Sequence, residues 1–135
     1  MSRFIKFIST AAIALTATAA FAAPEYLITA NHTNLNGRPG AVAYAYLYGK
    51  LPPSHPIMPG ETYPLPWSKI NFLCSNRPTC PATIRMGGNS SDTGIEIAQM
   101  VLNVSTGDIT PSLSIQNGYK IEVTGPGYIV ITNTN

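Results

Sequence analysis

The stretch AVAYAYLYG, residues 41–49, decides the fold class because its side chains alternate along the chain. Successive side chains of a β-strand point to opposite faces of a sheet, so this alternation predicts a strand. The two sets that would face apart are Val42, Tyr44, Tyr46 and Tyr48 on one side, and Ala41, Ala43, Ala45 and Leu47 on the other.

Similar short stretches lie on both sides of this strand and are separated by Gly, Pro and Asn. The Asn117-Gly118 pair, for example, is favoured in tight hairpin turns. The pattern predicts an all-β fold, a small antiparallel β-sandwich or barrel of about seven to eight short strands. The other predicted strands are residues 25–33, 67–74, 81–86, 95–104, 109–115 (interrupted by Pro111), 119–123 and 128–132.

The segment 95–104 fits two structures. Thr93 and Glu96 have the spacing of a helix capping box, which favours a helix. A strand with a bulge near Ala98 fits the same residues. Because the neighbouring segments are predicted strands, we favour the strand.

Residues 51–66 contain six prolines. Proline has no amide donor, so this segment is not expected to pair in the middle of a sheet. We expect an ordered extended or polyproline II segment that packs on the sheet, with a solvated linker as the alternative. The apolar residues that favour packing are Ile57, Met58, Tyr63, Leu65 and Trp67.

The N-terminus has the three parts of a secretory signal. Arg3 and Lys6 precede a short apolar run, and Ala20-Phe21-Ala22 forms a cleavage site. We therefore predict a helical signal peptide at residues 1–22, removed to leave a single β domain at residues 23–135. The apolar run is shorter than the roughly 20 residues of a spanning helix, so no stable membrane insertion is expected. The predicted location is the periplasm or the extracellular medium.

The predicted mature chain is electrically balanced. Without Arg3 and Lys6, six of the eight Lys and Arg residues remain, against six Asp and Glu residues. A neutral domain without a basic cluster lacks the electrostatic pattern of a nucleic-acid-binding protein. No nucleic-acid partner is therefore expected.

Cys74 and Cys80 are the two cysteines of the chain. In an oxidising compartment this pair predicts a structural disulfide, with Arg77 at the tip of the closed loop. A redox-active pair is the alternative, although such pairs are separated by two residues rather than five. A zinc site would require further ligands.

Residues that usually carry catalysis are scarce. His32 and His55 are the only histidines, and the six acidic residues are scattered. The loop Asn89-Ser90-Ser91-Asp92 has oxygen ligands but lacks the repeated acids of a calcium loop, so a plain turn is favoured. We predict no catalytic residue, cofactor or metal ligand, and the absence of a recognisable site argues against an enzyme.

Aromatic residues supply the candidate binding surface. Tyr44, Tyr46 and Tyr48 alternate on one strand face, and Trp67 follows the proline-rich segment. Such a row could bind a protein or glycan partner, whereas the alternative is that it packs inward beneath the proline-rich segment. The predicted function is an exported, non-catalytic binding module with an unknown ligand. The alternatives are a small secreted hydrolase-like enzyme and a structural subunit of a surface assembly.

Overall fold

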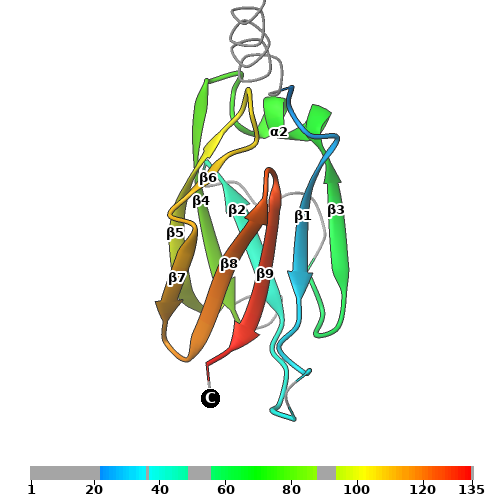
Figure 1. The fold of residues 1–135 in the computed structure, drawn as a ribbon, viewed down its shortest axis with the longest axis vertical. Coiled ribbons are helices and arrows are strands. Elements are labelled where there is room, and N and C mark those ends of the chain that lie inside the picture. The colour runs from blue at the N-terminus through cyan, green and yellow to red at the C-terminus, as the bar shows by residue number, and fades with distance from the viewer. Residues whose placement is uncertain (1–21, 36, 49–55, 88–93, 135) are drawn as a thin grey trace, which may run out of the picture.

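A computed structural model describes residues 22–35, 37–48, 56–87 and 94–134. The described residues form two β-sheets that face each other and one short helix, α2 (Trp67–Leu73), at one end (Figure 1). This arrangement confirms the predicted all-β fold and is a small β-sandwich. The described strands number nine, against the seven to eight expected.

The larger sheet has five strands in the order β3-β1-β9-β8-β7. The pairs in this sheet are antiparallel except for β1 and β9, which run parallel. Its strands are β1 (Tyr26–Asn31), β3 (Thr62–Pro66), β7 (Leu113–Gln116), β8 (Tyr119–Gly125) and β9 (Tyr128–Asn133).

The smaller sheet has four antiparallel strands in the order β2-β4-β5-β6. These are β2 (Ala43–Leu47), β4 (Thr79–Met86), β5 (Ile95–Asn103) and β6 (Ile109–Thr110). The inward faces of the two sheets enclose one apolar core, to which Leu47, Ile84, Leu102, Ile121 and Ile131 contribute. Its side chains come from both sheets, so the sandwich is held mainly by apolar burial.

Strand β5 contains the bulge that the sequence suggested. Ile84 of β4 lies opposite Ala98, but the next residue, Arg85, lies opposite Glu96. Ile97 is therefore the extra residue, and both Ile97 and Ala98 are buried. The strand interpretation of residues 95–104 was correct for the nine residues of β5.

The predicted strand at residues 67–74 is wrong, because these residues form α2. Trp67, Ile70 and Leu73 are its buried residues, and a spacing of three places them on one side of a helix. In a strand, Ile70 and Phe72 would share one face, but Ile70 is buried whereas Phe72 is 77% exposed. Burial of every third residue against the core outweighs the preference of the aromatic and branched side chains for strands.

The predicted strand at residues 109–115 is divided into β6 and β7, which belong to different sheets. Pro111 lies between them and cannot donate to a ladder. The chain therefore leaves the four-stranded sheet and enters the five-stranded one at this point.

The described part of the proline-rich segment packs on the sandwich as expected. Ile57 is buried and forms a bridge with Ala43, and Leu65 is also buried, whereas Met58 is exposed. Residues 62–66 form β3, which was not expected as a strand, although its place at the sheet edge agrees with the proline content. Residues 51–55 lie outside the described part.

Candidate functional site

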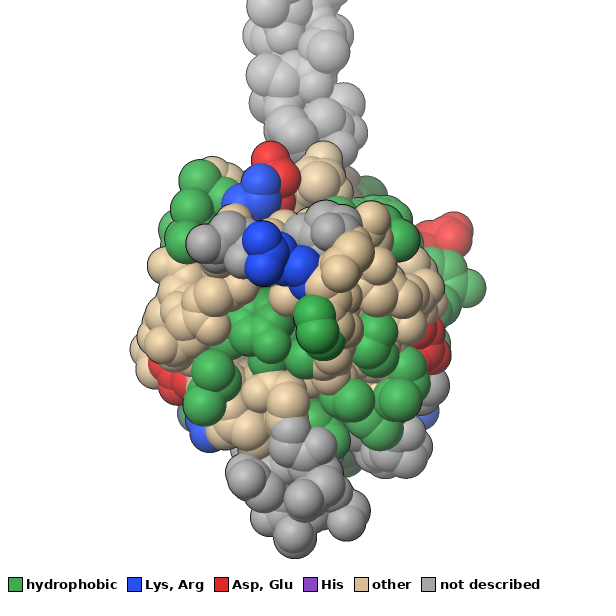
Figure 2. Space-filling view, turned by 90° about the horizontal axis from the view of Figure 1, so that it is seen from below, with side chains coloured by type: hydrophobic (Ala, Val, Ile, Leu, Met, Phe, Trp, Pro, Cys, Tyr) green, Lys and Arg blue, Asp and Glu red, His purple; other side chains and the backbone are tan. Residues whose placement is uncertain are grey.

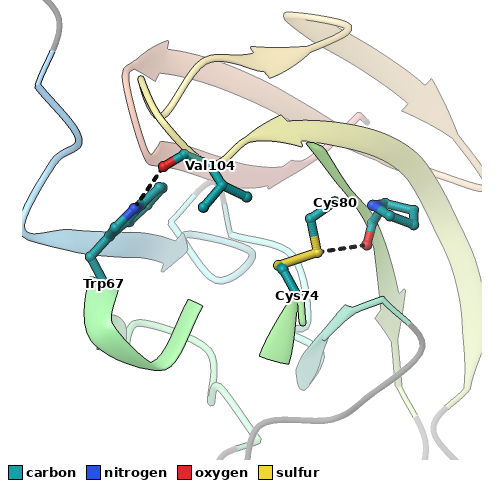
Figure 3. The surroundings of a disulfide bond; sticks show 5 residues. Trp67, Cys74, Cys80 and Val104 are labelled. Carbon is teal, nitrogen blue, oxygen red and sulfur yellow. Dashed lines mark hydrogen bonds between the residues drawn. A yellow bond between two sulfur atoms is a disulfide. The ribbon is translucent and has the colours of Figure 1, made fainter. Parts of the chain in front are cut away.

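The best candidate site lies around the disulfide bond, at the end of the sandwich that carries α2. Cys74 follows the helix and Cys80 belongs to β4, and their sulfur atoms are bonded (Figure 3). Both cysteines are fully buried. The predicted Cys74–Cys80 disulfide is therefore confirmed, and it fixes the loop between the helix and the strand.

Val104, just after β5, ties the start of the helix to this loop. Trp67 Nε1 donates a hydrogen bond of 3.0 Å to the Val104 carbonyl oxygen (Figure 3). The Val104 amide in turn donates to the Pro78 carbonyl oxygen at 2.9 Å. The loop is thus held at Pro78 as well as at its two cysteines.

The backbone of the loop is compact and left-handed at two consecutive residues. Ser75 has φ +56° and Asn76 has φ +57°. The amides of Ser75, Asn76 and Arg77 donate to the carbonyl oxygens of Phe72, Asn71 and Cys74. These bonds fix a conformation that residues other than glycine adopt only at an energetic cost.

Tyr48, immediately after β2, completes the site from the other side of the loop. It also has a positive φ, +53°, and its amide donates to the Pro81 carbonyl oxygen at 2.7 Å. The guanidinium carbon of Arg77 lies 5.0 Å from the centre of the Tyr48 ring, within the range of a cation–π interaction. The ring itself is half-buried against the core.

Unusual backbone conformations therefore gather at this site. Of the four non-glycine residues with positive φ in the described part of the chain, three are Tyr48, Ser75 and Asn76. Strain of this kind costs on the order of 1–3 kcal/mol per residue and clusters at functional sites. The disulfide and the hydrogen bonds described above are what hold it in place.

The outer side of α2 adds an apolar group and a cation next to the loop. Phe72 is 77% exposed, and with Ser68, Lys69 and Leu73 it lines a surface hollow of about 210 Å³. We call six exposed or half-buried residues of this region the disulfide pole: Tyr48, Lys69, Phe72, Ser75, Asn76 and Arg77. This set has two cations and no acid.

Other large apolar side chains are exposed elsewhere, so exposure alone does not single out Phe72. Leu113 and Ile115 of β7 and Leu35 are examples. Seen from the end opposite α2, hydrophobic side chains form separate patches among polar ones (Figure 2). The disulfide pole differs because its exposed aromatic adjoins a backbone fixed by a covalent bond.

The sequence-predicted aromatic residues do not form one exposed row. Tyr44 and Trp67 are each only 7% exposed, and Tyr46 is half-buried on β2. Tyr48 lies beyond the end of β2, where its positive φ takes it out of the strand alternation. A partner-binding role stays a prediction for all four residues, of which Tyr46 and Tyr48 are the more exposed.

Phe72, Ser75 and Asn76 were not predicted as site residues. The available signal was the spacing of Trp67, Ile70 and Leu73, which indicates a helix and places Phe72 on its outer side. Ser75 and Asn76 lie in the loop that the disulfide closes, and both are left-handed. Asn is enriched in the left-handed region, so residue type gives a weak signal at Asn76 and none at Ser75.

The described residues contain no group of three or more His, Cys, Asp and Glu placed to hold a metal ion. His55 and residues 89–92, which the sequence analysis singled out, lie outside the described part. No helix among the described residues has the length and apolar character needed to cross a membrane.

Comparison with known proteins gives two matches. The sequence profile of a family described as T2SS substrate NttC matches residues 1–134. The crystal structure of the Legionella pneumophila type II secretion system substrate NttC is 33% identical, with a TM-score of 0.70. That match covers 83% of this chain and 100% of the other. No curated protein matches the sequence.

Proposed function

Because this chain belongs to the NttC family of type II secretion system substrates, it is an exported protein, and we propose that it acts outside the cell as a non-catalytic binding protein. The proposed binding surface is the disulfide pole, and the proposed partner is a protein. The supporting observation is the rigid presentation of Arg77 on a loop closed by the Cys74–Cys80 bond, beside the exposed Phe72 of α2.

The composition of the disulfide pole supports a protein partner. Aromatic residues and arginine are enriched in protein interfaces, and tyrosine and arginine often carry much of the binding energy. Phe72 supplies an apolar anchor, while Arg77 and Lys69 supply positive charge. The matching surface would have an apolar recess beside carboxylate groups.

Rigidity supports the same proposal. A flexible loop loses conformational entropy when it binds, whereas a loop already fixed in the bound conformation avoids this loss. Here the disulfide, the Val104–Pro78 hydrogen bond and the Arg77–Tyr48 contact fix the loop before any partner arrives.

The test compares two surface variants of the mature protein. Phe72→Ser combined with Arg77→Ser removes the anchor and a cation, and Ile115→Ser removes an apolar residue of similar exposure, 63%, from β7. Wild type and each variant are used to capture proteins from host cells, and the captured proteins are identified. The affinity of each purified partner for wild type and for the two variants is then measured. We expect the partner to bind wild type and Ile115→Ser but not the double variant.

Loss of binding in Ile115→Ser with retention in the double variant would place the binding surface on β7 and contradict the proposal. Trp67 fluorescence serves as the folding control, because this side chain is buried in the core.

Replacing both Cys74 and Cys80 by Ala tests the contribution of rigidity. The loop keeps its exposed side chains but loses its covalent closure, so we expect weaker binding by about tenfold, equivalent to about 1.4 kcal/mol. Unchanged affinity in the folded variant would show that closure of the loop contributes nothing to binding.

A further inference from the structure

The two edges of the five-stranded sheet differ in their protection. At the β3 edge, Pro64 and Pro66 have no amide to offer a further strand. At the β7 edge, the residues Leu113–Gln116 include neither a proline nor a charged residue, which are common means of protecting an edge. The edge at which another strand can pair is therefore β7.

The open backbone groups of β7 belong to Leu113 and Ile115. The Val123 amide donates to the Ser112 carbonyl oxygen, which fixes the hydrogen-bonded positions of the β7–β8 ladder. Because these positions alternate along an antiparallel pair, the amides and carbonyls of Leu113 and Ile115 point away from β8. Among the described residues, no backbone group pairs with them on that side.

The side chains of the same two residues are apolar and exposed, Leu113 by 50% and Ile115 by 63%. They lie opposite Glu122 and Lys120 of β8, on the outer face of the sheet, since Ile121 between those two is fully buried. An edge that combines open backbone groups with exposed apolar side chains is a template for pairing with another strand.

Two side-chain hydrogen bonds fix the position of the β7–β8 hairpin. Ser114 Oγ donates to the Ile97 carbonyl oxygen at 3.4 Å, and Asn117 Nδ2 donates to the Glu96 carbonyl oxygen at 2.9 Å. Both acceptors belong to β5 of the other sheet. The open edge is therefore ordered before a partner arrives, which lowers the conformational entropy lost on pairing.

We propose that two copies of this protein pair through β7, antiparallel about a twofold axis at Ser114. In this register Leu113 of each copy lies opposite Ile115 of the other, and each such pair exchanges both of its N–H···O bonds. The apolar side chains of both copies then meet on the outer face, between Glu122 of one copy and Lys120 of the other.

A second copy suits this edge because it presents the same open backbone groups and the same two apolar side chains. The pairing uses the open edge of each five-stranded sheet while the β3 edge stays blocked, so it closes as a dimer rather than growing into a filament. Strand β7 lies away from the end of the sandwich that carries α2 (Figure 1). The disulfide pole of each copy therefore stays exposed in the dimer, and pairing is independent of partner binding.

Sedimentation velocity of the mature protein over a range of concentrations measures the pairing. Ile115→Pro removes the outward amide, keeps an apolar ring, and spares the β7–β8 ladder because this amide does not bond to β8. Ile115→Thr keeps the amide and loses apolar surface. Val101→Thr changes an apolar residue of β5 that is 46% exposed and is the matched control.

We expect wild type and Val101→Thr to form a dimer that dissociates on dilution, because a short strand pair buries little area. The dimer should be about tenfold weaker in Ile115→Thr and absent in Ile115→Pro. Equal dimerisation of Ile115→Pro and wild type would overturn the proposal. A wild type that stays monomeric would also overturn it and would leave the edge to an extended segment of another protein.

Cysteine substitutions test the register and serve as the second measurement if Ile115→Pro does not fold. An equimolar mixture of Leu113→Cys and Ile115→Cys should form an intermolecular disulfide under mild oxidation, because opposite Cα atoms of the pair lie about 5.5 Å apart. Either variant alone should cross-link far more slowly, since identical positions are offset by two residues and lie beyond disulfide reach. Equal rates in the mixture and in the single variants, followed by non-reducing electrophoresis, would overturn the pairing.

Discussion

At the scale of single residues, Asn31 makes four side-chain hydrogen bonds within the described part of the chain, at the end of the sandwich opposite α2. Its amide nitrogen donates to the carbonyl oxygens of Ala41 and Ile57, both at 2.7 Å. Its side-chain oxygen accepts from the Thr33 hydroxyl at 2.8 Å and from the Thr33 amide at 3.3 Å. Asparagine suits this place because it carries donors and an acceptor on one short side chain.

Asn31→Ala should lower the free energy of unfolding by about 3 kcal/mol, because it removes four hydrogen bonds at once and each contributes about 1 kcal/mol. Urea unfolding of the mature protein measures the effect. Asn71→Ala, on the exposed side of α2, is the matched control and should change stability by less than about 0.5 kcal/mol. Similar losses in both variants would mean that the Asn31 bonds add no net stability.

Trp67→Phe removes one hydrogen bond and part of a buried ring at the other end of the molecule. The ring remains apolar and buried, but the Val104 carbonyl oxygen loses its donor. We expect a loss of about 1–3 kcal/mol in urea unfolding. Phe72→Leu changes an exposed aromatic of the same helix and should stay within about 0.5 kcal/mol of wild type. A neutral Trp67→Phe would show that this hydrogen bond adds no net stability.

Among the structural elements, the edge strand β3 is protected by its prolines. The Asn31 amide donates to the Glu61 carbonyl oxygen, and the Trp67 amide donates to the Glu25 carbonyl oxygen. Because backbone groups along a strand point alternately to its two sides, the backbone nitrogens of Pro64 and Pro66 face away from β1. An amide at these places would be an open donor for another strand. Proline removes that donor, which explains how a segment rich in proline belongs to a sheet at all.

Replacing Pro64 and Pro66 with Thr should therefore promote self-association, because it restores two outward donors on the β3 edge. Light scattering of the mature protein over several days measures this effect. Thr62→Val raises the apolar character of the same edge without adding a donor and is the control. Association that is equal in the two proteins would attribute it to surface hydrophobicity instead.

The same elements show how far the sequence predicts the fold. The alternating side chains of residues 41–49 identified β2, and the Asn117-Gly118 pair identified the turn of the β7–β8 hairpin. Both signals are local in the sequence. The helix α2 was missed because seven residues offer only two repeats of its three-residue spacing. A short apolar run of this kind also resembles a strand, and only the packing of Trp67 and Leu73 against the core decides between the two.

Features of the whole molecule were beyond prediction for a different reason. The parallel pairing of β1 with β9 joins the two ends of the described domain, and no local pattern indicates which distant strands become neighbours. The disulfide pole likewise combines Tyr48 with residues 69–77 through packing between separate segments. Local alternation placed Tyr44, Tyr46 and Tyr48 together, although the chain turns away before Tyr48.

For the whole molecule, the final prediction concerns the route out of the cell. The chain belongs to a family of type II secretion system substrates, and its N-terminus has the parts of a signal peptide. Export would then have two steps, with signal removal at the inner membrane before passage to the medium. Inactivating the type II secretion system in the host should block only the second step.

We therefore expect mature protein that begins at Ala23 in the medium of the wild-type host and in the periplasm of the secretion-deficient strain. Intact-mass measurement of both fractions checks the N-terminus, and alkylation without reduction should label neither Cys74 nor Cys80 in either fraction. A periplasmic marker enzyme, retained in both strains, controls for lysis. Equal amounts in the medium of both strains would show a different route, and a mass that includes residues 1–22 would show that the signal is retained.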